Sequence, residues 1–345
     1  MGLKLDEIIR QTNKRFGEVI ITQGISDFSY KRIPFTSPRM NYCTFGGLPV
    51  GKITEFYGEE HGGKTTTALD IVANYQRSDD SRDVLYIDAE NTLDVEWATK
   101  LGVDVPKLVV LQPKSQSAEE IFQIIEDAVD TGEVGLWVLD SIGVLVSSAE
   151  MDEKKTYEDR TYGGISLPLT RFSKKIEMLM QRHTCTGIGI NQIRDNLASM
   201  YGGISTPGGK AWRHCCSVRM QFSRGKFTDE KGNELNKSAD APAGNIVLMS
   251  MTKNKTCPPS RRTGFYSLNY TDGIDYLKDL IDVAIRFDIV RKSGAWFDIV
   301  DIETGELLQG KIHGQPAVRE FFADLDNEKI RFRVERLVEK KMKEF

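Results

Sequence analysis

The chain has 345 residues, of which 40% are hydrophobic and 28% are charged. This excludes a disordered chain and a disulfide-stapled peptide, and it allows one large domain or a core with smaller attachments. The 46 basic and 50 acidic residues give a net charge of −4, which argues against attraction of nucleic acid by the whole surface. Five irregularly spaced cysteines without a C-x-x-C pair favour a reducing, cytoplasmic compartment, and no apolar stretch is long enough to suggest a membrane role.

An N-terminal arm is the first element that the pattern predicts. Apolar residues recur at helical spacing from Leu5 to Phe16, and Gly17 ends that helix before a strand-like run from Val19 to Thr22. Residues 24–49 carry several Pro and Gly residues, so we interpret them as a connection and not as core. We expect three parts: an arm with its connection over 1–35, a core over 36–269 and a C-terminal domain over 270–345.

Short apolar runs then alternate with helical patterns, which is typical of a mostly parallel sheet covered by helices. The expected strands cover 53–58, 84–90, 108–112, 136–141 and 187–193, and the expected helices cover 64–77, 94–101, 118–129 and 165–181. Later apolar runs at 217–222, 245–251 and 264–270 predict an antiparallel extension, and a helix over 328–343 closes the chain. We therefore predict an α/β fold: a mostly parallel twisted sheet flanked by helices, a small N-terminal helix–strand arm and a small α+β C-terminal domain.

A phosphate-binding motif lies between the first expected strand and helix. Residues 58–65 read G-E-E-H-G-G-K-T and fit the pattern G-x-x-x-x-G-K-[ST]. In this pattern backbone N–H groups surround phosphate oxygens, the Lys64 side chain pairs with the β and γ phosphates, and the Thr65 hydroxyl ligates Mg²⁺. The alternative is a glycine-rich helix entry without a ligand. The expected nucleotide-binding residues are Gly58, Glu59, Glu60, His61, Gly62, Gly63, Lys64, Thr65 and Thr66.

Acidic residues end two other expected strands. Asp140 follows an apolar run from Val134, and this position would place a second metal ligand beside Thr65. Glu90 ends another strand whose carboxyl end should face the same crevice, so it is a candidate to deprotonate an attacking water. Asp88 competes for this role, and spacing alone leaves the choice between the two open.

A long irregular segment follows the strand at 187–193. Residues 194–209 contain four glycines, and Leu197, Met200 and Tyr201 stand among polar neighbours. Six basic residues against one acid lie between Asn191 and Lys226. Basic groups that follow a phosphate backbone, together with apolar side chains that insert between bases, are typical of single-stranded nucleic-acid binding without sequence preference.

Several motifs, taken in order and spacing, resemble the RecA-type recombinases of the RecA/RadA superfamily, whose members include bacterial and phage-encoded proteins. They are GGLPVGKITEFYGEEHGGKTT, LYIDAENTLD, WATKLGVD, WVLDS, INQIR, TPGGKAW, TKNK and KSGAWF. The resemblance implies a RecA-type ATPase core and assigns the catalytic carboxylate to Glu90 and a place near Mg²⁺ to Asp140. It also implies that Asp94 contacts adenine and that Trp97 stacks on it, where the family often has Tyr.

The same resemblance implies roles for three residues at strand ends. Gln192 matches a glutamine that senses the γ-phosphate, and Lys253 and Lys255 match a lysine pair that reaches the ATP of the neighbouring subunit. Without the resemblance, each of these side chains has an ordinary alternative as a solvated group at the end of a strand.

Two DNA-binding loops are implied at about 151–164 and 193–209. Leu167 stands where the family usually has a DNA-contacting arginine, so Arg160 or Lys174 would replace it. The DNA-binding residues that follow from the resemblance and from the loop pattern are Arg160, Tyr162, Lys174, Arg194, Leu197, Met200, Tyr201, Gly208, Gly209, Lys210 and Arg213.

The expected function is that of an ATP-dependent DNA recombinase that uses ATP and Mg²⁺, forms helical filaments and exchanges strands. Its expected partners are single-stranded and double-stranded DNA, further copies of itself in a head-to-tail polymer, and single-strand-binding and loader proteins. Two alternatives stay open: a hexameric DNA motor with a related ATPase core, and a mediator that binds DNA and uses ATP only as a switch. A small-molecule kinase is disfavoured because no long loop resembles an acceptor pocket.

Overall fold

The structure is a computed structural model and describes residues 5–17, 30–152, 164–195, 204–230, 232–236 and 238–344. The chain forms two compact units, residues 1–31 and 32–345. The first contains the helix α1, Leu5–Phe16, which has acidic residues in its first turn and basic residues in its last, as the helix dipole favours. The expected helix is therefore confirmed, and the strand expected at 19–22 lies outside the described residues.

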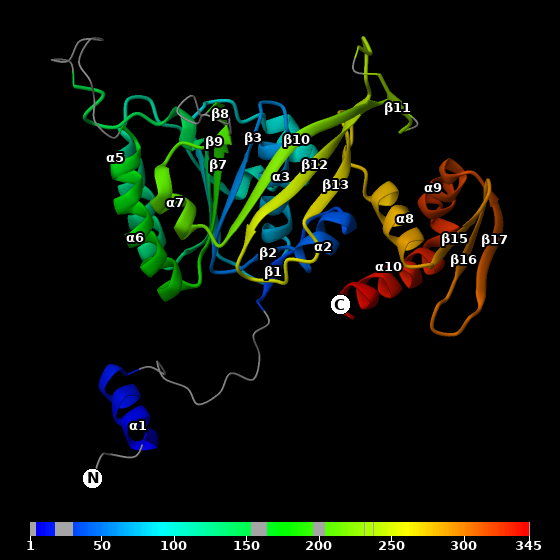
Figure 1. Cartoon of the computed structure of the whole chain (residues 1–345), viewed down its shortest axis with the longest axis horizontal. Helices are drawn as coiled ribbons and strands as arrows, with labels where there is room; N and C mark the ends of the chain where they lie inside the picture. Colours follow the sequence, from blue (N-terminus) through cyan, green and yellow to red (C-terminus); the bar gives the residue numbers. More distant parts are fainter. Residues whose placement is uncertain are drawn as a thin grey trace. The chain divides into compact units, whose positions relative to one another are not determined.

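The second unit contains the other helices and all the described strands (Figure 1). Its α-helices are α2 Pro38–Thr44, α3 Lys64–Gln76, α4 Val95–Lys100, α5 Ala118–Asp130, α6 Ser166–His183, α7 Gly209–Cys215, α8 Tyr276–Arg286, α9 Gln315–Ala323 and α10 Glu328–Lys343. Its strands are β1 Arg32–Ile33, β2 Leu48–Pro49, β3 Ile53–Gly58, β4 Asp83–Asp88, β5 Leu108–Leu111, β6 Val134–Asp140, β7 Thr186–Gln192, β8 Arg194–Asp195, β9 Ile204–Ser205, β10 Val218–Thr228, β11 Glu234–Leu235, β12 Gly244–Asn254, β13 Thr263–Asn269, β14 Gly273–Ile274, β15 Val290–Ser293, β16 Trp296–Val300 and β17 Leu307–His313.

The main sheet is mixed, with a parallel part and an antiparallel extension. Its strand order is β14-β13-β12-β10-β3-β7-β6-β4-β5, and β11 pairs with β10. The neighbours from β10 to β5 along this order run parallel, whereas β12, β13 and β14 add antiparallel pairs. This arrangement confirms the predicted α/β fold.

Alternating side chains of the central strands supply two separate cores, one on each face of the sheet. Along β6, Leu136 and Val138 pack in the core with α3, while Trp137 and Leu139 pack in the core with α5 and α6. Successive residues of a strand point to opposite faces, so an uninterrupted apolar run is what a sheet covered on both sides requires. Figure 1 shows α5, α6 and α7 together beside the parallel part of the sheet.

The interpretation of residues 24–49 as a connection outside the core is wrong for their described part. Ile33, Phe35, Met40 and Leu48 are at most 3% exposed and belong to the core that also contains α3. Ser37 caps the short helix α2 by accepting a hydrogen bond from the Met40 N–H. A helix of seven residues is too short to give a periodic pattern, which explains why the sequence did not indicate it.

The C-terminal part forms a small α+β layer, as expected. Strands β15, β16 and β17 make an antiparallel sheet, and α8, α9 and α10 share its apolar core. Arg39 of α2 joins this part to the main sheet through ion pairs with Asp279 and Asp282 of α8. The expected division of the chain at residues 35 and 269 remains a prediction. None of the helices in the described part of the chain has the length and apolar character that crossing a membrane requires.

Candidate nucleotide and DNA site

The carboxyl ends of four parallel strands meet at one edge of the main sheet. Gly58 at the end of β3 lies in register with Gln192 at the end of β7, and Asp88 of β4 lies in register with Asp140 of β6. Ligands of open α/β sheets bind outside this edge. The side chains that the sequence pointed to at these strand ends therefore share one region of the molecule.

The loop from β3 to α3 has the backbone that phosphate-binding loops require. Gly58 has φ 153° and Gly63 has φ 90°, both in the range that favours glycine. A Cβ atom on Gly58 would lie 2.0 Å from the carbonyl oxygen of Phe222, so no larger residue fits there. The loop leads directly into the N-terminus of α3, whose free N–H groups and dipole attract anions.

Lys64 is buried at the start of α3 and lies against this loop. Its Nζ donates hydrogen bonds to the carbonyl oxygens of Gly58 at 3.0 Å and Glu59 at 2.6 Å. Burial lowers the pKa of the Lys64 ammonium, while the charges of Asp140 and Glu90 act in the opposite direction. The cation is thus held at the loop between backbone oxygens and two acidic strand ends.

A cavity of about 410 Å³ opens beside the loop and is large enough for a nucleotide. The indole of Trp97 lines it, and Trp97 Nε1 donates to the Thr66 hydroxyl at 3.3 Å. Asp94 caps α4 by accepting from the Trp97 N–H at 3.0 Å, so it positions the helix that carries the indole. The described lining residues are His61, Gly62, Gly63, Lys64, Thr65, Thr66, Trp97, Arg224, Asn245, Leu268 and Tyr270.

Thr65 and Asp140 form the candidate metal site. The Thr65 hydroxyl donates to Asp140 Oδ2 at 2.8 Å, and the Tyr86 hydroxyl donates to the same oxygen at 2.9 Å. Burial raises the pKa of Asp140 to about 6, although both hydroxyl donors lower it. Mg²⁺ is commonly held by one or two protein oxygens together with phosphates and water, so this pair fits the ion. Among the described residues no cluster of three or more Asp, Glu, His or Cys side chains offers a cage made of protein alone.

Glu90 lies at the centre of a second polar group at the same edge. Glu90 Oε1 accepts hydrogen bonds from Ser141 Oγ at 2.5 Å and from Gln192 Nε2 at 3.2 Å. Asp88 instead accepts from the backbone N–H groups of Thr92 and Leu93, and it thereby fixes the turn after β4. This difference favours Glu90 over Asp88 as the carboxylate available for chemistry.

Lys253 and Lys255 lie at the end of β12, near the amino end of β3 and away from the loop of their own chain. Lys253 of β12 pairs with Arg219 of β10, and Arg219 pairs in turn with Glu55 near the start of β3. The phosphate-binding loop begins at Gly58, at the other end of β3. Lys253 Nζ donates to the carbonyl oxygens of Arg213 and His214, and Lys255 Nζ also donates to His214. Both cations therefore lie at the C-terminus of α7, where the helix dipole attracts positive charge.

Residues on both sides of the second expected DNA loop, which form its stem, donate hydrogen bonds to a buried carboxylate, Glu55. Glu55 is fully buried and accepts from Asn191 Nδ2 at 2.9 Å, from Trp212 Nε1 at 3.0 Å and from the Arg219 guanidinium. Asn191 also donates to the carbonyl of Pro207, and Arg219 to the hydroxyl of Thr206. Residues before and after the loop thus share one network with β3, the strand that leads into the phosphate-binding loop.

The described candidates for DNA contact lie on this loop stem and on two neighbouring helices. Arg194 of β8 is exposed and donates to the carbonyl of Gly143. Gly208 and Gly209 begin α7 with positive φ, and a Cβ on Gly208 would lie 2.4 Å from Leu169. Lys174 on α6 and Lys210 and Arg213 on α7 are all exposed. The other candidates, Arg160, Tyr162, Leu197, Met200 and Tyr201, lie outside the described residues.

Comparison with known proteins places the chain in a family. The family described as RecA N-terminal domain matches residues 3–275. The chain belongs to the RecA family. The protein RecA of Clostridium acetobutylicum is 36% identical over 262 residues, which cover 76% of this chain and 71% of that protein. The RecA of Fusobacterium nucleatum is 34% identical over 297 residues, covering 85% and 75%, and that of Ruminococcus albus is 32% identical over 306 residues, covering 88% and 73%.

Several residues of this candidate site were not indicated by sequence reasoning. Tyr86 lies inside an apolar strand, so no sequence pattern indicated its hydrogen bond to Asp140. Ser141 directly follows Asp140 in the motif WVLDS, and that position was a usable signal for its bond to Glu90. Arg224 counted only as one charge of a basic segment, yet it lines the nucleotide-sized cavity. Glu55 gave no signal because an acid within a short strand ordinarily faces solvent.

Proposed function

We propose that this chain is an ATP-dependent DNA recombinase. It assembles into helical filaments on single-stranded DNA, pairs that strand with a homologous duplex and exchanges strands, and it hydrolyses ATP to ADP and phosphate. The observation that carries the proposal is the hydrogen bond from Gln192 to Glu90, because it links the strand that enters the DNA loop to the carboxylate beside the phosphate-binding loop. Membership of the RecA family supports the same conclusion.

The residues of the cavity and of the adjacent strand ends have separate roles in handling ATP. The backbone of residues 58–66 and the Lys64 ammonium bind the phosphates, and the Trp97 ring stacks on adenine. Thr65 and Asp140 hold Mg²⁺, which neutralises negative charge on the phosphates when it is bound. Glu90 accepts the proton of the attacking water, and the hydrogen bonds from Ser141 and Gln192 keep its carboxylate oriented.

Lys253 and Lys255 complete the ATPase site of a neighbouring subunit in this proposal. The support is their position in the fold, since both lie near the amino end of β3 and away from the loop of their own chain. A cation supplied by a second subunit stabilises transition-state charge only when the subunits are assembled. Hydrolysis then depends on a head-to-tail contact, which produces a helical filament if it does not close.

DNA binding in this proposal is independent of sequence. The basic side chains Arg194, Lys210 and Arg213 contact the phosphate backbone, Lys174 extends this surface, and the apolar residues of the loop at 193–209 insert between bases. Specificity comes from pairing between the bound strand and the incoming duplex. Single-strand-binding and loader proteins are the further partners that this role implies.

Electron microscopy of the full chain with single-stranded DNA and a slowly hydrolysed ATP analogue tests the proposal. Continuous helical filaments that require nucleotide, together with strand exchange between homologous DNA molecules, are the expected result. Lys64→Ala is the control and should form no such filaments. Closed rings would favour a hexameric motor, and filaments with the analogue but no hydrolysis of ATP itself would favour a mediator; either outcome would contradict the recombinase.

A further inference from the structure

Tyr86 places a hydroxyl group inside an otherwise apolar core. It lies on β4, its side chain is 1% exposed, and it belongs to the core that also contains α3. In the parallel pairing of β4 with β6 it lies opposite Val138. Phenylalanine would fill the same space without a polar atom, whereas a buried hydroxyl needs a hydrogen-bond partner.

The partner of this hydroxyl is the carboxylate of Asp140. Val138 and Asp140 are two residues apart on β6 and therefore point to the same face of the sheet, on which Tyr86 also packs. The Tyr86 hydroxyl donates to Asp140 Oδ2 at 2.9 Å, and the Thr65 hydroxyl donates to the same oxygen at 2.8 Å. One oxygen of Asp140 thus connects β4 with the start of α3.

The two donors differ in how firmly they are held. The Tyr86 ring is enclosed by the core, so its hydroxyl oxygen has a fixed position. Thr65 is half-buried and lies in the first turn of α3, directly after the phosphate-binding loop. The carboxylate of an aspartate turns about a torsion with broad preferences, so one donor alone defines its orientation poorly. Tyr86 therefore supplies the fixed point that orients Asp140.

This hydrogen-bond pattern also determines what Thr65 can offer to a cation. A hydroxyl has one proton and two lone pairs, and the proton of Thr65 is directed at Asp140. The lone pairs of Thr65 Oγ1 are then left for a second partner, as ligation of a metal requires. Asp140 has to act as an acceptor only, and the second hydroxyl donor, from Tyr86, stabilises that ionised form.

The identity of the cation is sensitive to such positioning. Mg²⁺ requires a nearly ideal octahedron of close oxygen ligands, whereas Ca²⁺ accepts more oxygens at longer and more variable distances. A carboxylate that two hydroxyl donors hold in one orientation favours the smaller and more demanding ion. Loss of one donor should therefore weaken the binding of Mg²⁺ more than the binding of Ca²⁺.

We propose that Tyr86 is a positioning residue that orients Asp140 and thereby makes the site at Thr65 selective for Mg²⁺ over Ca²⁺. Tyr86 contacts neither the nucleotide nor the cation and acts only through the carboxylate. This role rests on the proposed function in one respect, because it takes Thr65 and Asp140 as the place where a cation binds together with a nucleotide.

Calorimetry of the full chain with ADP tests this role without relying on hydrolysis. The affinity for ADP is measured without metal, with saturating Mg²⁺ and with saturating Ca²⁺. The ratio of the affinities with and without metal, multiplied by the affinity of that metal for free ADP, gives the affinity of the ADP-bound chain for the metal. In Tyr86→Phe the Mg²⁺ affinity should fall about tenfold and the Ca²⁺ affinity less than about threefold, while the affinity for ADP alone should not change.

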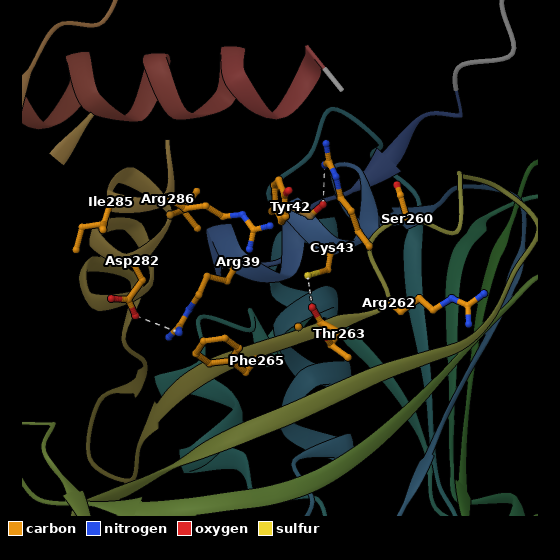
Figure 2. A pocket seen from close by; sticks show the side chains of 13 residues that line it. Arg39, Tyr42, Cys43, Ser260, Arg262, Thr263, Phe265, Asp282, Ile285 and Arg286 are labelled. Atoms are coloured by element: carbon orange, nitrogen blue, oxygen red, sulfur yellow. Dashed lines mark hydrogen bonds and ion pairs between the residues drawn. The ribbon is translucent and has the colours of Figure 1, made fainter. Parts of the chain in front are cut away.

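Two other tyrosines provide matched controls for the removal of a hydroxyl. Tyr57 is also buried, and its hydroxyl donates to Thr252 Oγ1 at 2.9 Å, but it follows Phe56 on β3 and so faces away from the core that contains Tyr86. Tyr42 lines the cavity between α2 and α8 that Figure 2 shows, which shares no lining residue with the nucleotide-sized cavity. Tyr57→Phe and Tyr42→Phe should bind ADP, Mg²⁺ and Ca²⁺ as the unmodified chain does.

Unchanged Mg²⁺ affinity in Tyr86→Phe overturns the proposal, and so do equal losses for the two metals, which would indicate a general disturbance of the site. A double substitution adds a second criterion. In an Asp140→Ala chain, Tyr86→Phe should cause no further loss of Mg²⁺ affinity, because Tyr86 acts only through that carboxylate; a further loss overturns the proposal as well.

The remaining outcomes separate this role from the proposed function. If Tyr86→Phe does not fold, Tyr86→Met removes the hydroxyl with a more adaptable side chain, and the same results for the two metals decide. An unmodified chain that does not bind ADP with Mg²⁺ would overturn both the proposed function and the role of Tyr86. Binding by Tyr86→Phe that equals binding by the unmodified chain would overturn the role of Tyr86 alone.

Discussion

Gln192 Nε2 donates a hydrogen bond to Glu90 Oε1 across 3.2 Å. The neighbour of Gln192 on β7, Asn191, donates instead to Glu55 and to the carbonyl of Pro207. Successive residues of a strand point to opposite faces, so the end of β7 contacts the candidate catalytic carboxylate with one side chain and the stem of the expected DNA loop with the next. A displacement of this strand end would therefore change both the contact of Gln192 with Glu90 and the contacts of Asn191 with the loop stem.

Glu90→Gln should abolish most ATP hydrolysis while leaving ATP binding intact. The amide keeps the size of the side chain but cannot accept a proton, and loss of a general base typically slows turnover by about 10² to 10⁴-fold. Phosphate release and nucleotide affinity, measured on the same preparation, check both halves of the prediction. Asp88→Asn is the comparison: it should disturb the turn at Thr92 and Leu93 and lower stability. Turnover in Glu90→Gln close to the original rate would show that another group is the base.

A mixture of two inactive variants should recover activity if Lys253 acts in the neighbouring subunit. Lys64→Arg lacks a working phosphate-binding loop, and Lys253→Ala lacks the cation supplied to the next subunit. In random head-to-tail polymers of an equal mixture, about one quarter of the sites combine an intact loop with an intact neighbouring lysine. DNA-stimulated ATPase of the mixture should thus reach about a quarter of the original rate. A mixture that is no more active than either variant alone would show that Lys253 does not act in the ATPase site of a neighbouring subunit.

Mg²⁺ binding should weaken in mild acid because of Asp140. Burial raises the pKa of this carboxyl to about 6, so the ionised form that binds a cation is lost as the pH falls through that value. Between pH 7.5 and 5.5 the ionised fraction falls about fourfold, and we expect a similar loss of Mg²⁺ affinity. Titration of Mg²⁺ with bound nucleotide measures this effect after the affinity of Mg²⁺ for free nucleotide at each pH is divided out. Asp140→Asn should bind weakly at both pH values.

Glu55→Gln should destabilise the chain far more than loss of an exposed acid. The substitution leaves Arg219 without its charged partner in a buried site, which typically costs about 3 to 5 kcal/mol in the free energy of unfolding. The midpoint of urea unfolding reports the change. Glu234→Gln, which breaks the exposed pair with Lys226, is the control and should cost no more than about 1 kcal/mol. Equal midpoints for the two variants would exclude a structural role for the buried network.

Trp97 should report nucleotide binding directly. Stacking on a base needs an aromatic face, so Trp97→Phe should keep ATP affinity within about threefold, whereas Trp97→Ala should lose about tenfold. Tryptophan fluorescence should change on addition of ATP in the original chain and in Trp296→Phe, which removes an exposed indole in the C-terminal sheet. Persistence of the full signal in Trp97→Phe would mean that adenine binds elsewhere.

The sequence predicted those parts of the molecule whose signals are local. The strands from β3 to β7 and the loop at Gly58 follow from short patterns, and their alternation with helices along the chain predicted a mostly parallel sheet. Spacing alone left the choice between Asp88 and Glu90 open, because it does not encode the hydrogen bonds that hold Asp88 to a turn; the resemblance to the family had already assigned the role to Glu90. The buried network around Glu55 could not be predicted, because the three hydrogen-bond partners of Glu55 lie 136, 157 and 164 residues away along the chain. Helix α2 was missed because seven residues carry too little periodicity.

Strand β12 begins in the nucleotide-sized cavity, where Asn245 is a lining residue, and reaches Lys253 near its other end. Eight residues of extended chain span at most about 26 Å, slightly less where the pairing with β10 shifts register between Met251 and Lys253, and a hydrogen-bonded strand inside a sheet stretches little. In the proposed filament β12 keeps a fixed distance between the ATP that a subunit binds and the lysines that it supplies to the next subunit. Any lengthening or shortening of the filament during the ATPase cycle must then occur at the joints between subunits, because the core of each subunit keeps its span.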